Sequence, residues 1–361
     1  MRAKKYLPRE RQGRAAAPAY HPALPDQTPW AAVLMTIIRR HNWSHAVRDK
    51  GVSHKTMAVR QTFLFAFFRE LRLNGEVPYR VDPRRLGNRH IRFMVQRWLD
   101  RELSPATLQQ YLSFLRTYAG WIGKPQLVMP VERYINDPKR TRRRYCAEVD
   151  KSWSARGIDA EQIFTAMAAI DRYAAAQLAV KSAFGLRRKE AVMLQPQRRV
   201  VTARQAGIAE DDDALYLDLL KGTKGGRQRY LPIDSDDKRR ALQRACELVR
   251  SLEDHLGNPA RTLKQNLRRI DYVMAKLGLT QSELGVTGHG LRHDFANDLY
   301  EKESGATAPL RGGAVVDSAT DQAARLAVAR QLGHGRIQIA GAYLGGRKRI
   351  GAKGSPSGSN E

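Results

Sequence analysis

The chain has 361 residues, with 63 Lys and Arg against 36 Asp and Glu, a formal charge of +27 and a sequence isoelectric point near 10.5. A charge of this size favours accumulation on a polyanion with release of counterions, so the expected partner is nucleic acid; the alternative is a basic surface that is merely solvated. No stretch reaches the roughly 20 apolar residues of a membrane span, and no apolar run at the N-terminus indicates a signal peptide, so we expect a soluble cytoplasmic protein with no membrane partner.

The length predicts two domains, because single cores stop growing at roughly 250 to 300 residues. Residues 1–29 are rich in Arg, Ala and Pro and lack periodicity, which indicates a basic flexible arm. Residues 30–124 are helical in pattern, with one apolar stripe between positions 57 and 73. Ser104 and Pro105 can begin a further helix as its cap and first residue. A bundle of three or four helices follows from this pattern.

Residues 125–154 read as a basic linker between the two domains. They contain three prolines and the charge run Lys139–Arg144. If the domains clamp a duplex, such a run crosses it and meets phosphates; the alternative is a solvated connector.

Residues 155–345 form the second predicted domain, which is α-dominated with a small antiparallel sheet. The expected helices and strands there span 160–173, 174–184, 215–220 and 228–232, and the remainder reads as helices. Glycines between the two strands favour a hairpin turn. Residues 346–361 are expected to form a flexible basic tail.

Five short motifs follow one another in this second domain. They are Gly185–Glu190 (Gly-Leu-Arg-Arg-Lys-Glu), the hairpin residue Lys224, His289–Arg292 (His-Gly-Leu-Arg), Leu332–His334 (Leu-Gly-His) and Tyr343, nine residues after the last histidine. This order resembles the tyrosine recombinase, or phage integrase, family. Each motif alone is weak, but five in the family's order are specific. The helical region before them resembles, less specifically, the family's core-binding domain.

The resemblance implies that Tyr343 attacks a DNA phosphodiester and forms a 3′-phosphotyrosyl intermediate. A phenol with the ordinary pKa near 10 is a poor nucleophile, so its surroundings must supply the rate. Tyr230 and Tyr300 are the alternatives, but neither lies at the family's distance from a Leu-Gly-His motif, and we expect both to be packing residues.

Two arginines are assigned to the non-bridging phosphate oxygens by the same resemblance, Arg187 and Arg292. Guanidinium groups offer planar, bidentate donors that stay charged. Arg188 is the alternative to Arg187, but the Gly-Leu-Arg register favours Arg187.

The remaining roles also come from the resemblance. Lys224 is expected to be the general acid for the departing 5′-oxygen, with Lys221 as the alternative in a different register. His289 is expected to accept a proton or to orient the tyrosine, and His334 to donate a hydrogen bond to the phosphate. Glu190 is expected to support the active site through a contact at a helix end or behind the catalytic residues; the alternative is a purely structural role.

Two cysteines, Cys146 and Cys246, do not suffice for a zinc cluster or a disulfide framework. His289 and His293 could share a helix face, but no glutamate lies between them and no third ligand is evident, so we expect no metal. The family resemblance likewise implies no cofactor.

Two features depart from the family pattern. Residues 301–320, between the last two histidine motifs, hold small residues typical of an inserted loop. Only 18 residues follow Tyr343, so a C-terminal helix that docks on a neighbouring protomer is not expected.

The resemblance therefore predicts a site-specific DNA recombinase, or integrase, of a bacterial mobile element that acts at the nucleoid. It implies double-stranded DNA as partner, a homotetramer on paired DNA sites, and accessory DNA-bending or directionality proteins. The alternatives are a type IB topoisomerase-like enzyme and a non-catalytic DNA-binding regulator of recombination.

Overall fold

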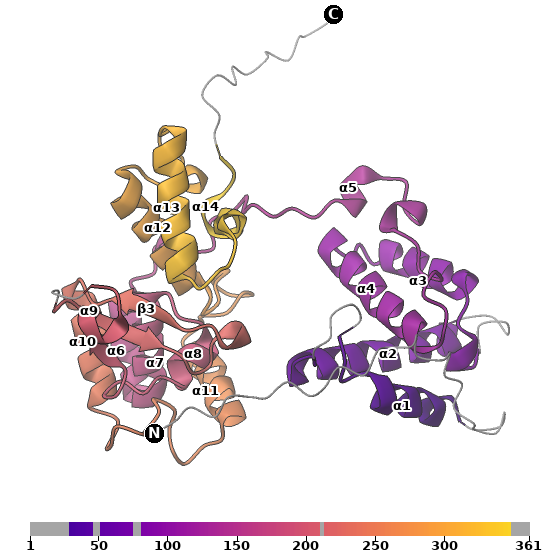
Figure 1. Cartoon of the computed structure of the whole chain (residues 1–361), viewed down its shortest axis with the longest axis horizontal. Helices are drawn as coiled ribbons and strands as arrows, with labels where there is room; N and C mark the ends of the chain where they lie inside the picture. Colours follow the sequence, from indigo (N-terminus) through magenta and orange to yellow (C-terminus); the bar gives the residue numbers. More distant parts are fainter. Residues whose placement is uncertain (1–28, 46–50, 75–80, 210–212, 348–361) are drawn as a thin grey trace, which may run out of the picture. The chain divides into compact units, whose positions relative to one another are not determined.

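The computed structural model describes residues 29–45, 51–74, 81–209 and 213–347. They belong to two compact units, which meet in the sequence between Arg144 and Tyr145 (Figure 1). The predicted arm at 1–29 and tail at 346–361 lie outside the described residues, apart from residues 29, 346 and 347.

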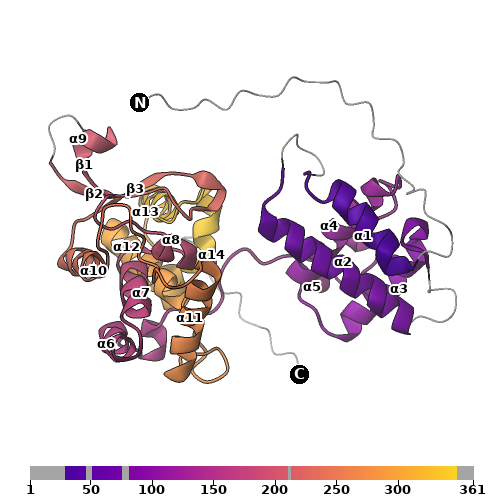
Figure 2. The ribbon, with the colours of Figure 1, turned by 90° about the horizontal axis from the view of Figure 1, so that it is seen from below.

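The first unit is a helical bundle. Its elements are α1 (Trp30–His41), α2 (His54–Asn74), η2 (Pro83–Arg85), α3 (Asn88–Asp100), α4 (Pro105–Trp121), η3 (Val131–Arg133) and α5 (Pro138–Thr141). Figure 2 shows α1 to α4 packed together. The predicted start of α4 is confirmed, because the Ser104 hydroxyl accepts a hydrogen bond from the Thr107 amide at 3.3 Å and Pro105 is the first helical residue. The apolar stripe of α2, including Phe63, Phe67 and Phe68, is buried in the bundle core.

The predicted linker at 125–154 is divided between the two units. Val128 and Val131 are buried in the core of the bundle, whereas Trp153 is buried in the core of the second unit. The Arg140 guanidinium donates to the carbonyl oxygen of Leu99 at 2.9 Å, so part of the basic run lies against the bundle. The DNA-crossing role of this segment stays a prediction.

The second unit contains the remaining elements. Its helices and turns are η4 (Ser154–Arg156), α6 (Ala160–Ile170), α7 (Arg172–Phe184), α8 (Arg188–Val192), α9 (Ala203–Ala206), η5 (Lys224–Gly226), α10 (Asp236–Cys246), α11 (Leu263–Lys276), α12 (Gly290–Ser304), η6 (Pro309–Arg311), α13 (Ser318–Gln331), η7 (Ile337–Ala340) and α14 (Gly341–Leu344). The helix predicted over 160–173 ends earlier, at Ile170. Asp171 leaves the helical conformation, and its carboxylate caps α7 by accepting from the Ala174 amide at 3.1 Å.

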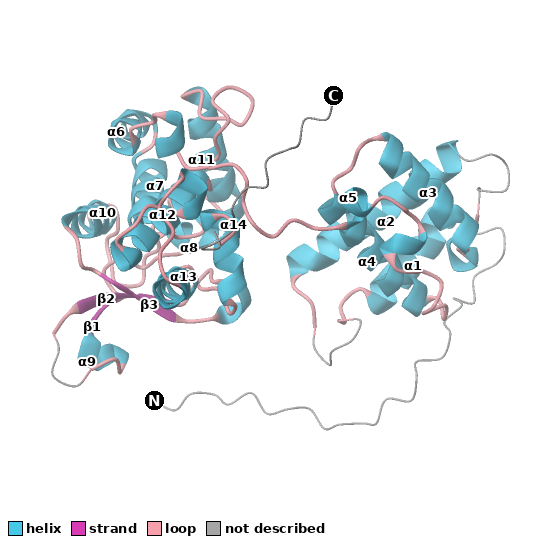
Figure 3. Ribbon diagram, turned by 90° about the horizontal axis from the view of Figure 1, so that it is seen from above, coloured by secondary structure: helices cyan, strands magenta, loops and turns pink. Residues whose placement is uncertain are grey.

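A three-stranded antiparallel sheet lies at the side of the second unit (Figure 3). Its order is β1 (Val200–Thr202), β2 (Leu215–Leu219), β3 (Arg229–Pro232), and Leu217 faces both Val200 and Leu231. The two predicted strands are confirmed. β1 was not predicted, because a strand of three residues is too short to show an alternating pattern. The predicted fold class, mainly α with a small antiparallel sheet, is confirmed.

Helices α12, α13 and α14 share an apolar cluster of their own, in which Tyr343 is buried. Figure 1 shows α12 and α13 side by side, in agreement with their contacts. The loop predicted over 301–320 is shorter than expected. Gly305 ends α12 in the left-handed conformation with φ +69°, and the Asp317 carboxylate caps α13 by accepting from the Ala319 amide at 2.9 Å.

Across the ranges that the structure describes, no helix combines the length and the apolar character needed to cross a membrane.

Candidate active site

Three of the predicted site residues meet in the second unit: Arg292 of α12, His334 after α13, and Tyr343 of α14. Arg292 Nε donates to Tyr343 Oη at 3.1 Å. His334 Nε2 lies 3.3 Å from Arg292 Nη2 and 3.4 Å from Tyr343 Oη. Arg292 is fully buried and Tyr343 is 6% exposed. A guanidinium, an imidazole and a phenol thus form one hydrogen-bonded cluster.

Backbone carbonyls hold the Arg292 side chain in place. Nη1 donates to the oxygen of Gly185, and Nη2 donates to that of Leu332 at 2.5 Å. Gly185 has φ +59°, and a Cβ there would stand 2.4 Å from Phe295 Cδ1. Only glycine permits this approach, so the first residue of the Gly-Leu-Arg motif allows the end of α7 to reach α12.

Arg187, the residue at the N-cap position of α8, is held by the fully buried Glu190. The Glu190 carboxylate accepts from the Arg187 amide at 2.7 Å and from Arg187 Nη1 at 2.8 Å, and from Arg229 Nη2 at 2.8 Å. Burial alone would raise the pKa of Glu190, but Arg229 and Arg187 outweigh it and lower the pKa to about 2. Arg188 instead pairs with the exposed Asp271. Glu190 therefore holds Arg187 by two hydrogen bonds, and its support of the active site stays a prediction.

Two histidines of the α12 region flank the tyrosine ring. The ring centroid of Tyr343 lies 6.0 Å from that of His289 and 4.8 Å from that of His293. Burial, followed by the charge of Lys181, lowers the pKa of His289 to about 3, and burial lowers the pKa of His293 to about 4. Both rings are therefore neutral at neutral pH. From the sequence alone, His293 is considered only as a possible metal ligand. Its spacing of four residues from His289 on one helix is the signal that could have placed it beside the tyrosine.

Lys181 of α7 lies near His289 and Arg292, and the sequence did not predict it as a site residue. Its side chain is buried, and its Nζ has no hydrogen-bond partner within the described part of the chain. Burial and then the charge of Arg292 lower the pKa of Lys181 to about 7. It lies in an alanine-rich helix outside the five motifs, so no sequence pattern marked it. In its protonated form it adds to the positive charge of Arg187 and Arg292, which attracts an anion to the site.

Lys224, on the hairpin between β2 and β3, lies near enough to His334 for its charge to act on that ring. Burial and then Arg292 lower the pKa of His334 to about 4, and the charge of Lys224 adds to this effect. Lys221 instead adds to the lowering of the pKa of His255. Of the two candidate lysines, Lys224 is therefore the one whose charge acts on a residue of the cluster of Arg292, His334 and Tyr343, and its role as general acid stays a prediction.

A hollow of about 340 Å³ opens beside His334. It is lined by Arg227, Gln228, Arg229, Tyr230, Arg330, Gln331, Gly333 and His334. Arg229 is paired with Glu190, and the other two arginines on its walls, Arg227 and Arg330, suit a phosphate backbone.

Tyr300 and Tyr230, the alternative nucleophiles, form hydrogen bonds outside the cluster of Arg292, His334 and Tyr343. Tyr300 is buried and donates to Asp321 at 2.8 Å, and the Tyr230 hydroxyl accepts from Gln228 at 3.0 Å on the hairpin. Among the residues with described positions, no three His, Cys, Asp or Glu side chains are arranged to hold a metal ion.

The neutral histidines predict a pH dependence of stability. The folded-state pKa values of His289 and His293 lie below the ordinary value of 6.5, so between about pH 4 and 6.5 the unfolded chain binds protons that the folded chain does not. Stability should fall as pH falls through this window. We expect His293→Gln to reduce the slope of the unfolding free energy against pH by the amount that corresponds to nearly one bound proton. Urea unfolding at a series of pH values measures this slope.

His54→Gln, which replaces an exposed histidine of the first unit, is the matched control. A slope in His293→Gln equal to that of the unsubstituted protein would contradict the assignment of a buried neutral His293.

Two family models match the chain. The integrase model matches residues 147–298, and the model of the phage integrase N-terminal domain matches residues 40–128. The first match includes Arg187, Lys224 and Arg292 and ends before His334 and Tyr343. A comparison with curated proteins found no match.

Solved structures of integrases resemble the chain at low identity. A lambda integrase fragment, residues 75–356, solved as a dimer bound to a COC′ core site, is 15% identical, with 90% of this chain and 99% of that chain covered and a TM-score of 0.53. A lambda integrase tetramer bound to a Holliday junction is 17% identical, with coverages of 89% and 80% and a TM-score of 0.50. The Tn1549 transposon integrase in complex with circular intermediate DNA is 14% identical, with coverages of 86% and 93% and a TM-score of 0.47. The lambda integrase likenesses show that the chain has an integrase-like fold.

Proposed function

Since this chain belongs to the phage integrase family of tyrosine recombinases and is a site-specific DNA recombinase, we propose that Tyr343 is its nucleophile. The observation that carries this assignment is the cluster in which Arg292 Nε donates to Tyr343 Oη while His334 lies within 3.4 Å of both side chains. A guanidinium that holds the nucleophile's oxygen can also hold the phosphate which that oxygen attacks.

The cleavage step exchanges one phosphoester bond for another. Tyr343 Oη attacks the phosphorus and passes its proton to His289, which is neutral. The bond from phosphorus to the 5′-oxygen breaks, and its electron pair leaves on that oxygen, which takes a proton from Lys224. The products are a 3′-phosphotyrosine and a free 5′-hydroxyl. Rejoining runs in reverse, with a 5′-hydroxyl as nucleophile and Tyr343 as leaving group.

The charges around the site suit this step. Arg187 and Arg292 neutralise the non-bridging oxygens, and His334 adds a hydrogen bond. In the free chain these cations help to lower the pKa of His289, so the arriving phosphate anion raises it and makes His289 a better proton acceptor.

We further propose that double-stranded DNA is the substrate and that four copies act together on paired sites, assisted by accessory DNA-bending or directionality proteins. The formal charge of +27 and the arginine-lined hollow beside His334 support DNA binding. The lambda integrase structures, which include a tetramer on a Holliday junction, supply the precedent for the assembly. Integration or excision of a mobile element is the outcome that we propose for the exchange.

A recombination assay tests this proposal against its alternatives. Supercoiled DNA that carries two copies of a site selected by its affinity for the protein is expected to yield products with exchanged flanks. A topoisomerase would relax the DNA without exchange, and a regulator would bind it and leave it intact. Either of these results would contradict the proposal. The match of residues 40–128 to the phage integrase N-terminal domain already disfavours the topoisomerase interpretation.

A further inference from the structure

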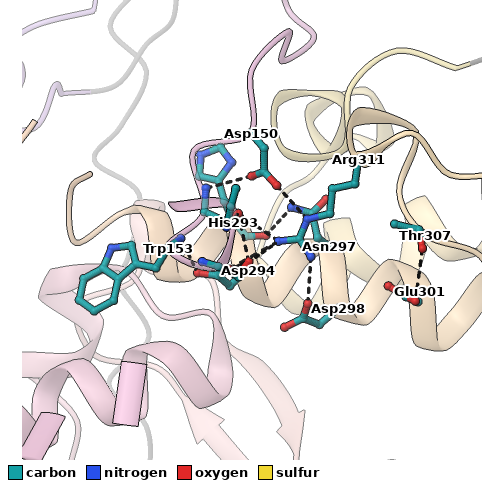
Figure 4. Close-up of polar contacts among 12 residues, drawn as sticks. Asp150, Trp153, His293, Asp294, Asn297, Asp298, Glu301, Thr307 and Arg311 are labelled. Atoms are coloured by element: carbon teal, nitrogen blue, oxygen red, sulfur yellow. Dashed lines mark hydrogen bonds and ion pairs between the residues drawn. The ribbon is translucent and has the colours of Figure 1, made fainter. Parts of the chain in front are cut away.

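The loop between α12 and α13 carries Arg311. Its guanidinium contacts the segment of residues 147–154, near the start of the second unit, which is called the opening segment. Arg311 Nε donates to Asp150 Oδ2 at 2.8 Å. Its Nη2 donates to the hydroxyl oxygens of Ser152 at 3.0 Å and Ser154 at 2.9 Å. Figure 4 shows the Arg311 side chain reaching toward Asp150. One side chain thus ties the loop between α12 and α13 to residues 150–154.

The same guanidinium contacts α12, the helix of Arg292. It lies 3.5 Å from Asp294 and 3.4 Å from Asp298 (Figure 4). Asp294 in turn accepts from the Trp153 amide at 2.9 Å, so loop, opening segment and helix share one polar cluster. The side chains of Arg311, Asp150 and Asp294 are 20%, 13% and 15% exposed, so their pairs are shielded from solvent more than a surface pair, whereas Asp298 is 68% exposed.

Trp153 packs the opening segment against the first turn of α12. Its side chain is 1% exposed, and its Nε1 donates to the carbonyl oxygen of Thr287 at 2.9 Å. The indole lies so close to Gly290 that a Cβ there would stand 2.5 Å from Trp153 Cδ1. Movement of the segment therefore moves the turn that presents His289 and Arg292.

The opening segment and the loop also touch the helix of the tyrosine. The amide of Ala147 donates to the carbonyl oxygen of Gly341, two residues before Tyr343, at 2.8 Å. Leu310, next to Arg311, packs against Gly345, where a Cβ would lie 3.2 Å from the Leu310 Cβ. Residues 147–154 therefore contact both elements whose side chains meet in the Arg292–Tyr343 cluster.

We infer that Arg311 is a positioning residue for strand cleavage: it holds residues 150–154 against α12, and so fixes His289 and Arg292 relative to Tyr343. This inference rests on the proposed role of Tyr343. The held segment belongs to the second unit, which begins at Tyr145.

Loss of the Arg311 charge leaves Asp150, Asp294 and Asp298 without the cation that they share. Repulsion between Asp150 of the segment and Asp294 of α12 then favours separation of the two elements. A displacement on the order of 1 Å at the reacting groups costs roughly 100-fold in rate.

The test is Arg311→Gln in single-turnover cleavage of a nicked duplex at saturating DNA, with rate and amplitude of the covalent adduct recorded separately. We expect the rate to fall roughly 10- to 100-fold while the amplitude and the DNA affinity stay close to those of the unsubstituted protein. Arg311→Lys, which keeps the charge but cannot reach all partners at once, should lie between. Arg239→Gln is the matched control, because it removes one positive charge from an exposed pair with Asp236 on α10.

A merely structural role lowers the amplitude, because fewer molecules are folded, and leaves the rate of the folded molecules unchanged. An unchanged or higher rate in Arg311→Gln, whatever the amplitude, overturns the inference. Asp150→Asn provides a second measurement: combined with Arg311→Gln it should slow cleavage no further than Arg311→Gln alone, and multiplication of the two effects would contradict action through Asp150. Absence of an adduct from the unsubstituted protein would instead count against the proposed function.

Discussion

Replacement of Tyr343 by phenylalanine is expected to abolish the covalent protein–DNA adduct, with a loss of at least roughly 10,000-fold in cleavage rate. The substitution removes the attacking oxygen and keeps the ring that packs in the cluster of α12, α13 and α14. DNA affinity should therefore change little. The measurement is adduct formation on a nicked duplex beside DNA binding by the same preparation.

Tyr300→Phe is the matched control for this experiment. Tyr300 is buried in the same apolar cluster. Tyr300→Phe likewise removes a tyrosine hydroxyl, and with it the hydrogen bond to Asp321 at 2.8 Å. It should still form the adduct. Adduct formation by Tyr343→Phe, or its loss in both variants, would contradict the assignment of the nucleophile.

Lys224→Ala is expected to slow cleavage of ordinary DNA by roughly 100- to 10,000-fold, because the departing 5′-oxygen then lacks its proton donor. The structure brings Lys224 near enough to His334 for its charge to act on that ring. A substrate with sulfur in place of the bridging 5′-oxygen tests the role directly. A thiol has a pKa near 8.5 and leaves as thiolate without a proton, so this substrate should restore most of the lost rate.

Lys221→Ala is the control, since Lys221 lies on the same hairpin and acts on His255 instead. It should cleave both substrates nearly as fast as the unsubstituted protein. If the sulfur substrate fails to rescue Lys224→Ala, the lysine acts on phosphate binding rather than on proton transfer. If Lys221→Ala shows the rescued defect, the register of the hairpin is wrong.

Motif spacing predicted much of the candidate site because the motifs encode local geometry. Arg292 lies three positions after His289, about one helical turn. Tyr343 lies nine positions after His334, and one short turn and one short helix bridge this distance. The two longer strands were predictable from composition and from the glycines between them. These features depend on residues that are near one another in sequence.

The rest depends on contacts between distant segments. Lys181 contributes through burial beside Arg292, which an alanine-rich helix does not reveal. Arg311 lies in a glycine-rich loop, and only the fold brings it to Asp150, 161 residues away in sequence. Asp171 could be read as a helical residue until its capping of α7 is seen.

The most direct test of the central claim is identification of the residue that becomes linked to DNA. The protein is incubated with a nicked duplex from which the cleaved fragment escapes, and the adduct is digested and mapped by mass spectrometry. We predict a nucleotide attached to the peptide that contains Tyr343. Attachment to any other residue, or tight binding without an adduct, would contradict Tyr343 as the nucleophile of this recombinase.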